Sequence, residues 1–371
     1  MDCVRFKSAH QFQVWLGLFC CLLPSAVVAQ EFSQLFVVGD SLSDTGNAAA
    51  TRDAAVGVFA YDKTLSYTFG LCSPLDSDLQ SCGLVFFEKS RVSDGPVAVE
   101  RLSEGLKLGA LAPSFHLLPL FGIDRPSVGS NYAVASAKAR GSGLEDLTSQ
   151  VDALVLDHSR PNLPAGALYV VAIGGNDGLD ALQATAALLT DAARTESSGE
   201  IIEAGVEAIA FNVQRLIDSG ARYILVLNMP NIGAVPAVRG ATDGLLRVLT
   251  RRAAALLART FNAQLWWSLR EVQLRNPSAQ VEIFDLYTTF EVERARAFFS
   301  GTNIQVGCFD SRKYFDDGIR TFHGDCAPAA ENLAADFDQF IFWDDLHPTA
   351  RTHAAIGDAL VEAAHGLLES P

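Results

Sequence analysis

The chain has 371 residues, of which 49% are hydrophobic and 19% are charged. This composition is too apolar for a disordered tail, and the length allows one large α/β domain or two smaller ones. A formal net charge of −15 disfavours nucleic acid and anionic membrane surfaces as partners, because both attract clustered Lys and Arg.

Residues 1–29 have the features of a secretory signal peptide. A basic start with Arg5 and Lys7 precedes an apolar run from Val14 to Leu23, and small residues surround the expected cleavage point. The apolar run is shorter than the roughly 20 residues that a membrane-spanning helix needs. We therefore expect cleavage after Ala29, a secreted or periplasmic location and no stable membrane anchor.

Short apolar runs alternate with amphipathic segments along the rest of the chain, residues 30–371. Buried strands are predicted at residues 34–38, 167–173, 223–227 and 281–284. Apolar stripes at helical spacing predict helices over residues 147–155, 202–216, 245–261 and 349–368. This alternation indicates an α/β fold in which a parallel sheet carries helices on both faces, with ligand sites beyond the carboxyl ends of the strands.

Residues 50–128 interrupt this alternation and are rich in turn-forming residues. We interpret them as an elaborated loop region inside a single domain that spans residues 30–371, because no linker-like boundary separates them. Two roles stay open for the aromatic side chains of this region, which could line a substrate mouth or fill a satellite core. These side chains are Phe59, Tyr61, Tyr67, Phe69, Phe86 and Phe87.

Four cysteines remain once the signal peptide is removed, and an even number fits an oxidising compartment. The simplest of the three possible pairings joins near neighbours, Cys72–Cys82 and Cys308–Cys326. Each disulfide would close a loop on the order of 10 to 20 residues and stabilise the fold by roughly 3 kcal/mol. A zinc site is disfavoured because the cysteines form no C-x-x-C pair, and we expect no metal.

The first predicted strand ends in Gly39-Asp40-Ser41-Leu42, which places a serine in a turn at the carboxyl end of the strand. This segment resembles the first motif block of the GDSL esterases and lipases, members of the SGNH hydrolase superfamily, in which the serine is the nucleophile. Three further segments resemble later blocks in the family's order: 129–137, Gly174-Gly175-Asn176-Asp177 and Asp344-Asp345-Leu346-His347-Pro348. The resemblance extends from residue 35 to about 360 and implies a flavodoxin-like, doubly wound sheet.

A serine hydroxyl is a poor nucleophile unless a general base, usually a histidine held by a carboxylate, takes its proton. Asp344 and His347 lie three residues apart just before a predicted helix, so they can share one turn and leave the Nε2 atom of His347 facing Ser41. Asp345 is a rival orienting residue, and the family spacing favours Asp344. We expect the remaining mature histidines to be surface groups or satisfied core groups: His116, His158, His323, His353 and His365.

Acyl transfer also needs hydrogen-bond donors for the developing oxyanion. The backbone N–H of Ser41 is one candidate, and the resemblance implies two more, the side-chain amide of Asn176 and the backbone N–H of Ser136. Ser136 stands where the family has glycine, so its backbone conformation is an open question. Asp40 and Gly174 are expected to support the site from the neighbouring positions of their motif blocks.

These observations predict an exported serine esterase or lipase that hydrolyses carboxylic esters of lipids or small alcohols through an acyl-enzyme. The chain contains no Gly-x-Ser-x-Gly, P-loop, dinucleotide-binding or His-Glu-x-x-His motif, so no cofactor is implied. We expect a monomer whose partner is an ester substrate. Two alternatives stay open: acyl transfer to an alcohol at the same site, and a non-catalytic lipid- or glycan-binding protein on the same scaffold.

Overall fold

The computed structural model of the protein describes residues 31–55, 91–158, 163–187, 196–240, 243–309, 326 and 337–369. The expected signal peptide, the Cys72–Cys82 pair and the six aromatic residues singled out in the loop region lie outside these residues. Internal contacts divide the chain into two units, Met1–Glu31 and Phe32–Pro371. All the helices and strands described here belong to the second unit.

A four-stranded parallel sheet lies at the centre of this unit, with the order β1-β2-β3-β4. Its strands are β1 (Leu35–Gly39), β2 (Leu168–Ala172), β3 (Tyr223–Leu227) and β4 (Gln280–Phe284). Each lies within a residue or two of a predicted strand. Every residue of β1 and β2 is buried, as expected for apolar strands that are covered on both faces.

A segment around Asn131 extends the sheet on the free side of β1. The N–H of Val37 donates to the carbonyl of Ser130 (3.0 Å), the N–H of Tyr132 donates to the carbonyl of Val37 (2.7 Å), and Val37 and Asn131 form a parallel bridge. The chain therefore passes from β1 to residues 130–132 on one side and then crosses to β2 on the other. This reversal is the doubly wound feature, and it places a crevice beyond the carboxyl end of β1.

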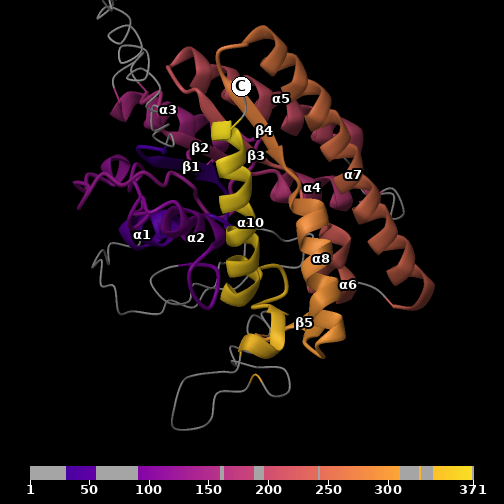
Figure 1. Cartoon of the computed structure of the whole chain (residues 1–371). Helices are drawn as coiled ribbons and strands as arrows, with labels where there is room; N and C mark the ends of the chain where they lie inside the picture. Colours follow the sequence, from indigo (N-terminus) through magenta and orange to yellow (C-terminus); the bar gives the residue numbers. More distant parts are fainter. Residues whose placement is uncertain are drawn as a thin grey trace, which may run out of the picture. The chain divides into compact units, whose positions relative to one another are not determined.

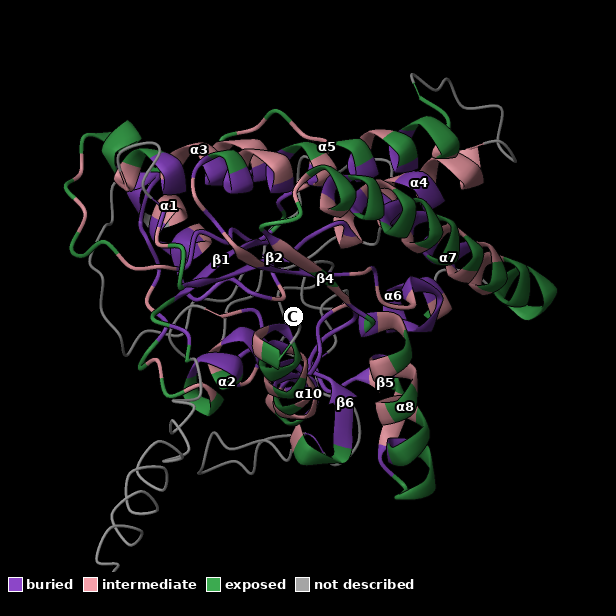
Figure 2. Cartoon of the chain, turned by 45° about the horizontal axis from the view of Figure 1, so that its top comes forward, coloured by how far each residue is buried: buried purple, intermediate pink, exposed green. Residues whose placement is uncertain are grey.

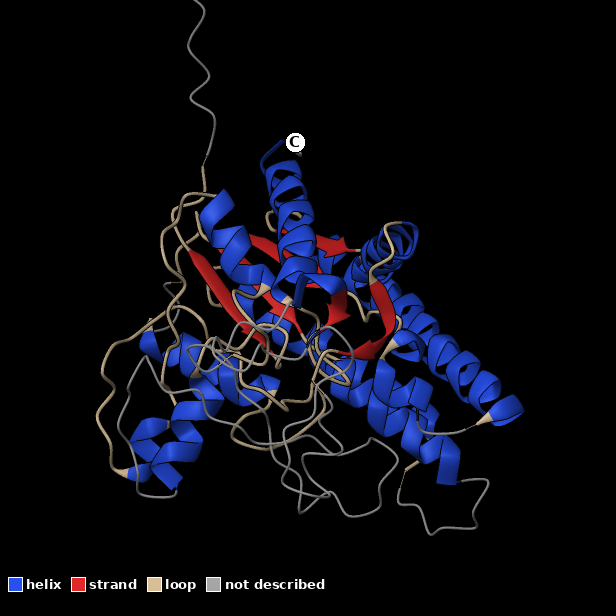
Figure 3. Cartoon of the chain, turned by 90° about the horizontal axis from the view of Figure 1, so that it is seen from below, coloured by secondary structure: helices blue, strands red, loops and turns tan. Residues whose placement is uncertain are grey.

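Helices cover both faces of the sheet, which confirms the predicted fold class (Figures 1 and 2). One face carries α3 (Leu147–Asp157), α4 (Gly175–Ala187), α5 (Ser198–Asp218) and α7 (Gly244–Arg275). The other face carries α2 (Ala98–Gly105), α8 (Leu286–Phe299) and α10 (Ala350–Glu369). In the view of Figure 3 the strands lie between these helices. No helix in the described part of the chain combines the length and apolarity required to cross a membrane.

The apolar stripe of α5 shows why these segments become helices. Ser197 caps the helix by accepting the N–H of Glu200, whose side chain in turn accepts the N–H of Ser197, so two backbone donors at the helix start are satisfied. The buried positions of α5 then recur every three or four residues toward the sheet. In α7 the buried stripe continues through Leu265, Leu269 and Val272, which extends that helix beyond the predicted residues 245–261.

Shorter elements complete the described chain. They are α1 (Asn47–Ala55), η2 (Leu118–Phe121), η3 (Ile232–Ala234), α6 (Pro236–Gly240) and η5 (Phe337–Gln339). A separate two-stranded parallel sheet joins β5 (Asn303–Gly307) to β6 (Phe340–Phe342).

The region interpreted as an elaborated loop, residues 50–128, is partly helical, because it contains α2 and η2 and the end of α1. Helix α2 packs against α10.

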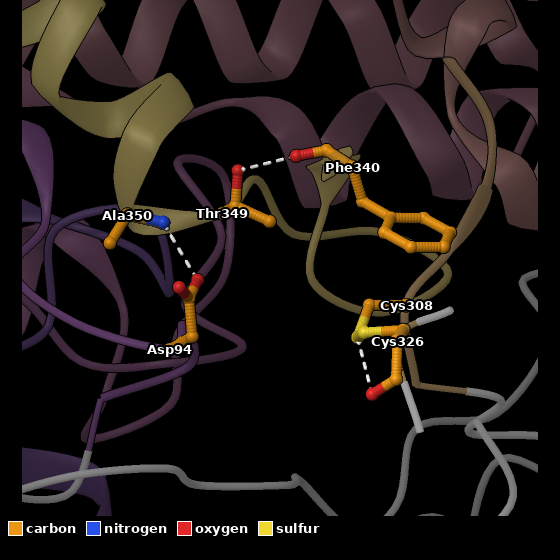
Figure 4. Close-up of a disulfide and its surroundings, with 6 residues drawn as sticks. All are labelled: Asp94, Cys308, Cys326, Phe340, Thr349 and Ala350. Atoms are coloured by element: carbon orange, nitrogen blue, oxygen red, sulfur yellow. Dashed lines mark hydrogen bonds between the residues drawn. A yellow bond between two sulfur atoms is a disulfide. The ribbon is translucent and has the colours of Figure 1, made fainter. Parts of the chain in front are cut away.

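The disulfide Cys308–Cys326 lies next to the two-stranded sheet (Figure 4). The N–H of Cys308 donates to the carbonyl of Phe342 at 3.0 Å, so the disulfide is tied to the last residue of β6. Beyond β6, the hydroxyl of Thr349 donates to the carbonyl of Phe340 (2.9 Å), and Asp94 accepts the N–H of Ala350 at the start of α10 (2.7 Å). These contacts hold both ends of the segment 343–349.

Candidate active site

Ser41 lies two residues after the end of strand β1, whose last residue, Gly39, is closely packed. A Cβ atom on Gly39 would lie 2.6 Å from the carbonyl oxygen of Ala172 in β2, so no larger residue fits there without a shift of the backbone. Gln150 of α3 pairs with Gly39 as a neighbouring strand would: its amide accepts the N–H of Gly39 and donates to the Gly39 carbonyl, both at 2.7 Å. This side chain, which the sequence analysis missed, fixes the backbone just before Ser41.

The turn that follows is built on Asp40. Its backbone carbonyl accepts the N–H groups of Ser43 and Asp44, both at 3.0 Å, and its carboxyl group accepts the N–H of Leu42 at 3.1 Å. Burial raises the pKa of Asp40 to about 7, although the Leu42 N–H and the nearby His347 oppose the shift. Ser41, at the apex of the turn, is 8% exposed.

Asp44 joins the Ser41 turn to the segment of the second motif block. Its carboxylate accepts the N–H groups of Gly46, Asn47 and Ala48 at 2.7 to 3.0 Å, and that of Ala135 at 2.8 Å. Because Ala135 immediately precedes Ser136, one fully buried side chain positions both segments. Burial raises the pKa of Asp44, and its four N–H partners act in the opposite direction by stabilising the carboxylate.

His347 and Asp344 lie beside Ser41 at hydrogen-bond distance. The Nε2 atom of His347 is 2.9 Å from the Oγ atom of Ser41, and its Nδ1 atom is 2.9 Å from the Oδ2 atom of Asp344. Asp344 is fully buried and His347 is 4% exposed. The structure thus brings together Ser41, Asp344 and His347, although Ser41 and His347 are 306 positions apart in the chain.

A tight turn presents the imidazole. The Oδ1 atom of Asp344 accepts the backbone N–H groups of Leu346 (2.7 Å) and His347 (2.6 Å), and the N–H of Trp343 donates to the carbonyl of His347 (2.7 Å). One carboxylate therefore shapes the turn and orients the ring. Asp345, the rival orienting residue, contributes a backbone carbonyl that accepts the N–H of Ala237 at 2.8 Å.

Gly307 of β5 lets this turn pack closely. A Cβ atom at position 307 would lie 2.3 Å from the backbone oxygen of Asp344 and 2.8 Å from its Cα atom. Any other side chain would therefore push Asp344 away. The sequence analysis did not identify Gly307, because nothing local to β5 indicates which segment lies against it.

The candidate oxyanion donors differ in how the structure holds them, and Asn176 is fixed through its side chain. Its amide donates to the carbonyl of Ala137 at 2.8 Å, which holds the side chain and leaves a second N–H. Ser136 has a φ of 70°, so its backbone adopts the left-handed conformation that glycine prefers. Within the described residues no hydrogen bond engages the backbone N–H of Ser41 or Ser136.

Gly174, the residue expected to support the site from the third motif block, has a φ of 123°. A Cβ atom there would meet the ring of Phe261 at 2.8 Å. Both the backbone conformation and the close contact therefore require glycine immediately before α4, the helix that carries Asn176.

A pocket opens in front of these side chains. Ser41, Asn176 and His347 line it, whereas Ser136 is not among the described lining residues. The remaining lining residues are mostly apolar: Asp40, Leu42, Gly175, Leu179, Pro230, Ile232, Val235 and Leu346. A polar cluster at the base of an apolar pocket is the usual form of a small-molecule site.

The other described histidines lie outside this cluster, and two depart from their expected role. His116 contacts the hydroxyl of Ser114 at 2.7 Å, His158 packs edge-on against Phe36, and His365 is exposed. His116 and His353 are both buried, and the Nε2 atom of each has no hydrogen-bond partner within the described residues, so the expectation of satisfied core histidines is wrong for both. His323 lies outside the described residues. No cluster of His, Cys, Asp or Glu able to hold a metal ion occurs in the described part of the chain.

Comparison with known proteins places this site in a family. The profile of the GDSL-like Lipase/Acylhydrolase family matches residues 35–360. Two GDSL esterase/lipases of Arabidopsis thaliana are 21% and 25% identical to the chain, each over 90% of it and over 87% and 91% of their own lengths. A phosphatidylcholine-sterol acyltransferase of Aeromonas hydrophila is 23% identical over 94% of both chains. The chain therefore belongs to the GDSL-like lipase/acylhydrolase family and is a serine ester hydrolase.

Proposed function

We propose that the protein is an exported esterase or lipase in which Ser41, His347 and Asp344 form the catalytic triad. The observation that carries the proposal is the continuous series of contacts from Asp344 through His347 to Ser41, each at 2.9 Å and all buried. A serine, an imidazole and a carboxylate in this order are the parts that nucleophilic acyl transfer requires.

In the proposed acylation step, the Oγ atom of Ser41 attacks the ester carbonyl carbon while the Nε2 atom of His347 takes the hydroxyl proton. Asp344 holds the Nδ1 proton and stabilises the imidazolium that forms. The tetrahedral intermediate then collapses, the alcohol leaves with the proton returned by His347, and Ser41 carries the acyl group. Water attacks the acyl-enzyme by the same route, which releases the acid and restores Ser41.

Three donors are proposed to bind the oxyanion in both steps: the backbone N–H groups of Ser41 and Ser136 and the side-chain amide of Asn176. The left-handed backbone of Ser136 supports its part, because the residue adopts the conformation expected of the glycine that it replaces. The contact of Asn176 with the carbonyl of Ala137 supports a fixed amide, since a donor held before the reaction needs no reorganisation.

The signal-like composition of residues 1–29 and the disulfide Cys308–Cys326 support export to an oxidising compartment. The proposed mature enzyme is a single hydrolase domain of residues 30–371 that acts as a monomer on an ester substrate. N-terminal sequencing of the protein from culture fluid or periplasm tests cleavage after Ala29, and retention of residues 1–29 would contradict it.

The direct test of the proposed activity is hydrolysis of p-nitrophenyl acetate by the purified protein and by Ser41→Ala. Loss of activity in the variant supports the triad. Equal rates for both proteins would favour the non-catalytic binding protein.

Acyl transfer is the second candidate function, and the similarity to a phosphatidylcholine-sterol acyltransferase favours it. An alcohol would then replace water in the second step, with the same three residues at work. Product analysis in the presence of a competing alcohol separates the two: a new ester indicates transfer, and free acid alone indicates hydrolysis.

A further inference from the structure

The beginning of helix α7, residues 244–252, carries a group of exposed apolar side chains, and we call it the α7 tip. Every residue from 244 to 249 is exposed, and Leu245 retains 74% of its accessible surface. The exposed apolar residues of the tip are Leu245, Leu246, Val248 and Leu249. In Figure 2 this end of α7 extends past the neighbouring helices. Monomeric proteins rarely expose so many large apolar side chains together, so the tip indicates an interaction surface.

Arginine side chains surround these apolar residues. Helix α7 contains six arginines and one glutamate, whereas the whole chain has a net charge of −15. Partial burial and the charge of three neighbouring guanidinium groups lower the pKa of Arg239 in α6 to about 10, so this side chain stays cationic at neutral pH. The three neighbours are Arg251, Arg294 and Arg247.

The arginines near the tip are only partly neutralised. Arg247 pairs with Asp243, and Arg294 of α8 pairs with Glu291 at 2.6 Å. Arg252 is exposed and has no ion-pair partner within the described residues. These arginines therefore outnumber the acidic side chains that pair with them, and the tip combines apolar and cationic groups.

An anionic lipid bilayer fits both features of the α7 tip. Its interfacial region accepts apolar side chains to a depth of about 5 to 10 Å, and its phosphate groups pair with guanidinium groups. A symmetric contact with a second copy of the chain fits less well, because it would bring two arginine clusters together.

The acidic net charge of the whole chain does not oppose this local attraction. At physiological ionic strength, interactions between exposed charges are largely screened beyond about 8 Å. The arginines at the tip are therefore the charges that a membrane meets there, although the chain as a whole disfavours an anionic surface.

Close contacts join the α7 tip to the wall of the Ser41 pocket. A Cβ atom on Gly233 would lie 2.3 Å from the backbone oxygen of Arg251, and the Nε atom of Arg251 donates to the carbonyl of Gly233 at 3.2 Å. Ile232 and Val235, on either side of Gly233 in the sequence, line the pocket. A surface bound at the tip would therefore lie at the same edge of the sheet as Ser41.

We propose that the α7 tip docks the protein on anionic lipid bilayers, with its leucines and Val248 in the interfacial region and the surrounding arginines on lipid phosphates. The contact is peripheral and reversible, so it needs no membrane-spanning helix. The inference goes beyond the proposed function, because docking requires no reaction at Ser41.

The proposal is tested by flotation of the purified protein with vesicles of phosphatidylcholine alone or with about one third phosphatidylglycerol. We expect at least about tenfold tighter binding to the anionic vesicles. This affinity should fall at least about tenfold between about 0.1 M and about 0.5 M NaCl, because salt screens the arginines. Absence of binding to the anionic vesicles, or equal binding to both kinds, overturns the proposal.

The apolar part is tested by the double variant Leu245→Ser/Leu249→Ser, which should bind the anionic vesicles at least about tenfold more weakly. Leu156→Ser is the matched control, because Leu156 is 76% exposed near the end of α3, away from the tip. Its affinity should stay within about twofold of wild type. Both variants should hydrolyse p-nitrophenyl acetate at the wild-type rate, which shows that they fold.

The charged part is tested by Arg252→Gln. One arginine near an anionic surface contributes about fivefold in affinity, so the variant should lose about that factor. Arg270→Gln is the control, because Arg270 is exposed on the same helix but lies roughly 27 Å further along it, at ~1.5 Å per residue. An equal loss in Arg270→Gln or in Leu156→Ser would overturn the assignment to the tip.

Two further outcomes separate the remaining possibilities. Ser41→Ala should bind the vesicles as wild type does, so failure of the triad leaves the docking result intact, and failure of docking leaves the triad intact. Sedimentation without vesicles tests the second copy as occupant. A wild-type dimer that dissociates in Leu245→Ser/Leu249→Ser, together with absence of vesicle binding, would overturn the proposal in favour of self-association.

Discussion

Replacement of Asp344 by Asn tests how one carboxylate supports the site. Asp344 accepts three hydrogens, from the Nδ1 atom of His347 and from the backbone N–H groups of Leu346 and His347. Asparagine has one acceptor oxygen and one NH2 group in the same space. If the oxygen keeps the two backbone donors, the NH2 group faces Nδ1 and forces the ring proton onto Nε2, where it blocks proton transfer from Ser41.

The loss of the correct tautomer is worth a factor of about 10³ to 10⁴ in kcat, or ~4 to 5 kcal/mol of transition-state stabilisation. The reverse orientation of the amide would leave two buried N–H groups unpaired and cost about 1 to 3 kcal/mol of folding stability for each. We therefore expect Asp344→Asn to lower kcat on p-nitrophenyl acetate by about 10³ or more, with a measurable loss of stability in urea denaturation.

Asp345→Asn is the matched control, because Asp345 is the neighbouring carboxylate, whereas the Nδ1 atom of His347 lies against Asp344. Its kcat should stay within about threefold of wild type. Retention of more than about a tenth of wild-type kcat by Asp344→Asn, or an equal loss in Asp345→Asn, would refute the assignment of Asp344 as the orienting residue.

Three further substitutions follow from the packing and charge of the site. Gly307→Ala places a methyl group against the backbone of Asp344. It should lower the free energy of unfolding, measured with denaturant, by ~1 to 3 kcal/mol and lower kcat by at least about tenfold. An unchanged kcat would contradict the contact. Ser136→Gly keeps the backbone N–H and removes the cost of a left-handed serine, so kcat should change less than about twofold and stability should not fall. Because burial raises the pKa of Asp40 from 3.8 to about 7, the folded protein retains a proton that the unfolded chain has lost, and its free energy of unfolding falls as the pH rises through this window. Asp40→Asn has no such titrating group. The free energy of unfolding of Asp40→Asn minus that of wild type should therefore grow by on the order of 4 kcal/mol from about pH 4 to about pH 7. If this difference in unfolding free energy does not vary with pH, Asp40 is not buried as a neutral acid.

The strands and the long amphipathic helices could be predicted from the sequence because each carries its own periodicity. Continuous apolar runs gave β1 to β4, and apolar stripes gave α3, α5, α7 and α10. Helix α8 was missed because only Leu286, Phe290 and Ala297 are buried in it, which leaves no continuous stripe. Strand β5 mixes polar and apolar residues, and β6 has only three residues, so neither could be recognised before their pairing is known.

The site residues were proposed from motif blocks, and the structure shows the contacts that no motif contains. Gln150 and Gly307 support Ser41 and Asp344 from elements that are distant in sequence, so only the folded chain reveals them. The sequence could likewise not show whether Ser136 adopts a glycine-like backbone, because its φ depends on the loop around it. His116 and His353 were expected to be surface or satisfied core histidines, and only the folded chain shows that each has a buried Nε2 atom without a hydrogen-bond partner within the described residues.

The central claim is that His347 activates Ser41 as the nucleophile, and a phosphonate that mimics the tetrahedral intermediate tests it most directly. Purified protein is incubated with ethyl p-nitrophenyl methylphosphonate, the released p-nitrophenolate is counted, and the modified peptide is identified by mass spectrometry. The account predicts one equivalent released per chain, the adduct on Ser41 and a rate at least about 10³ lower in His347→Ala. An adduct on another residue, or labelling of Ser41 at the same rate without His347, would contradict it.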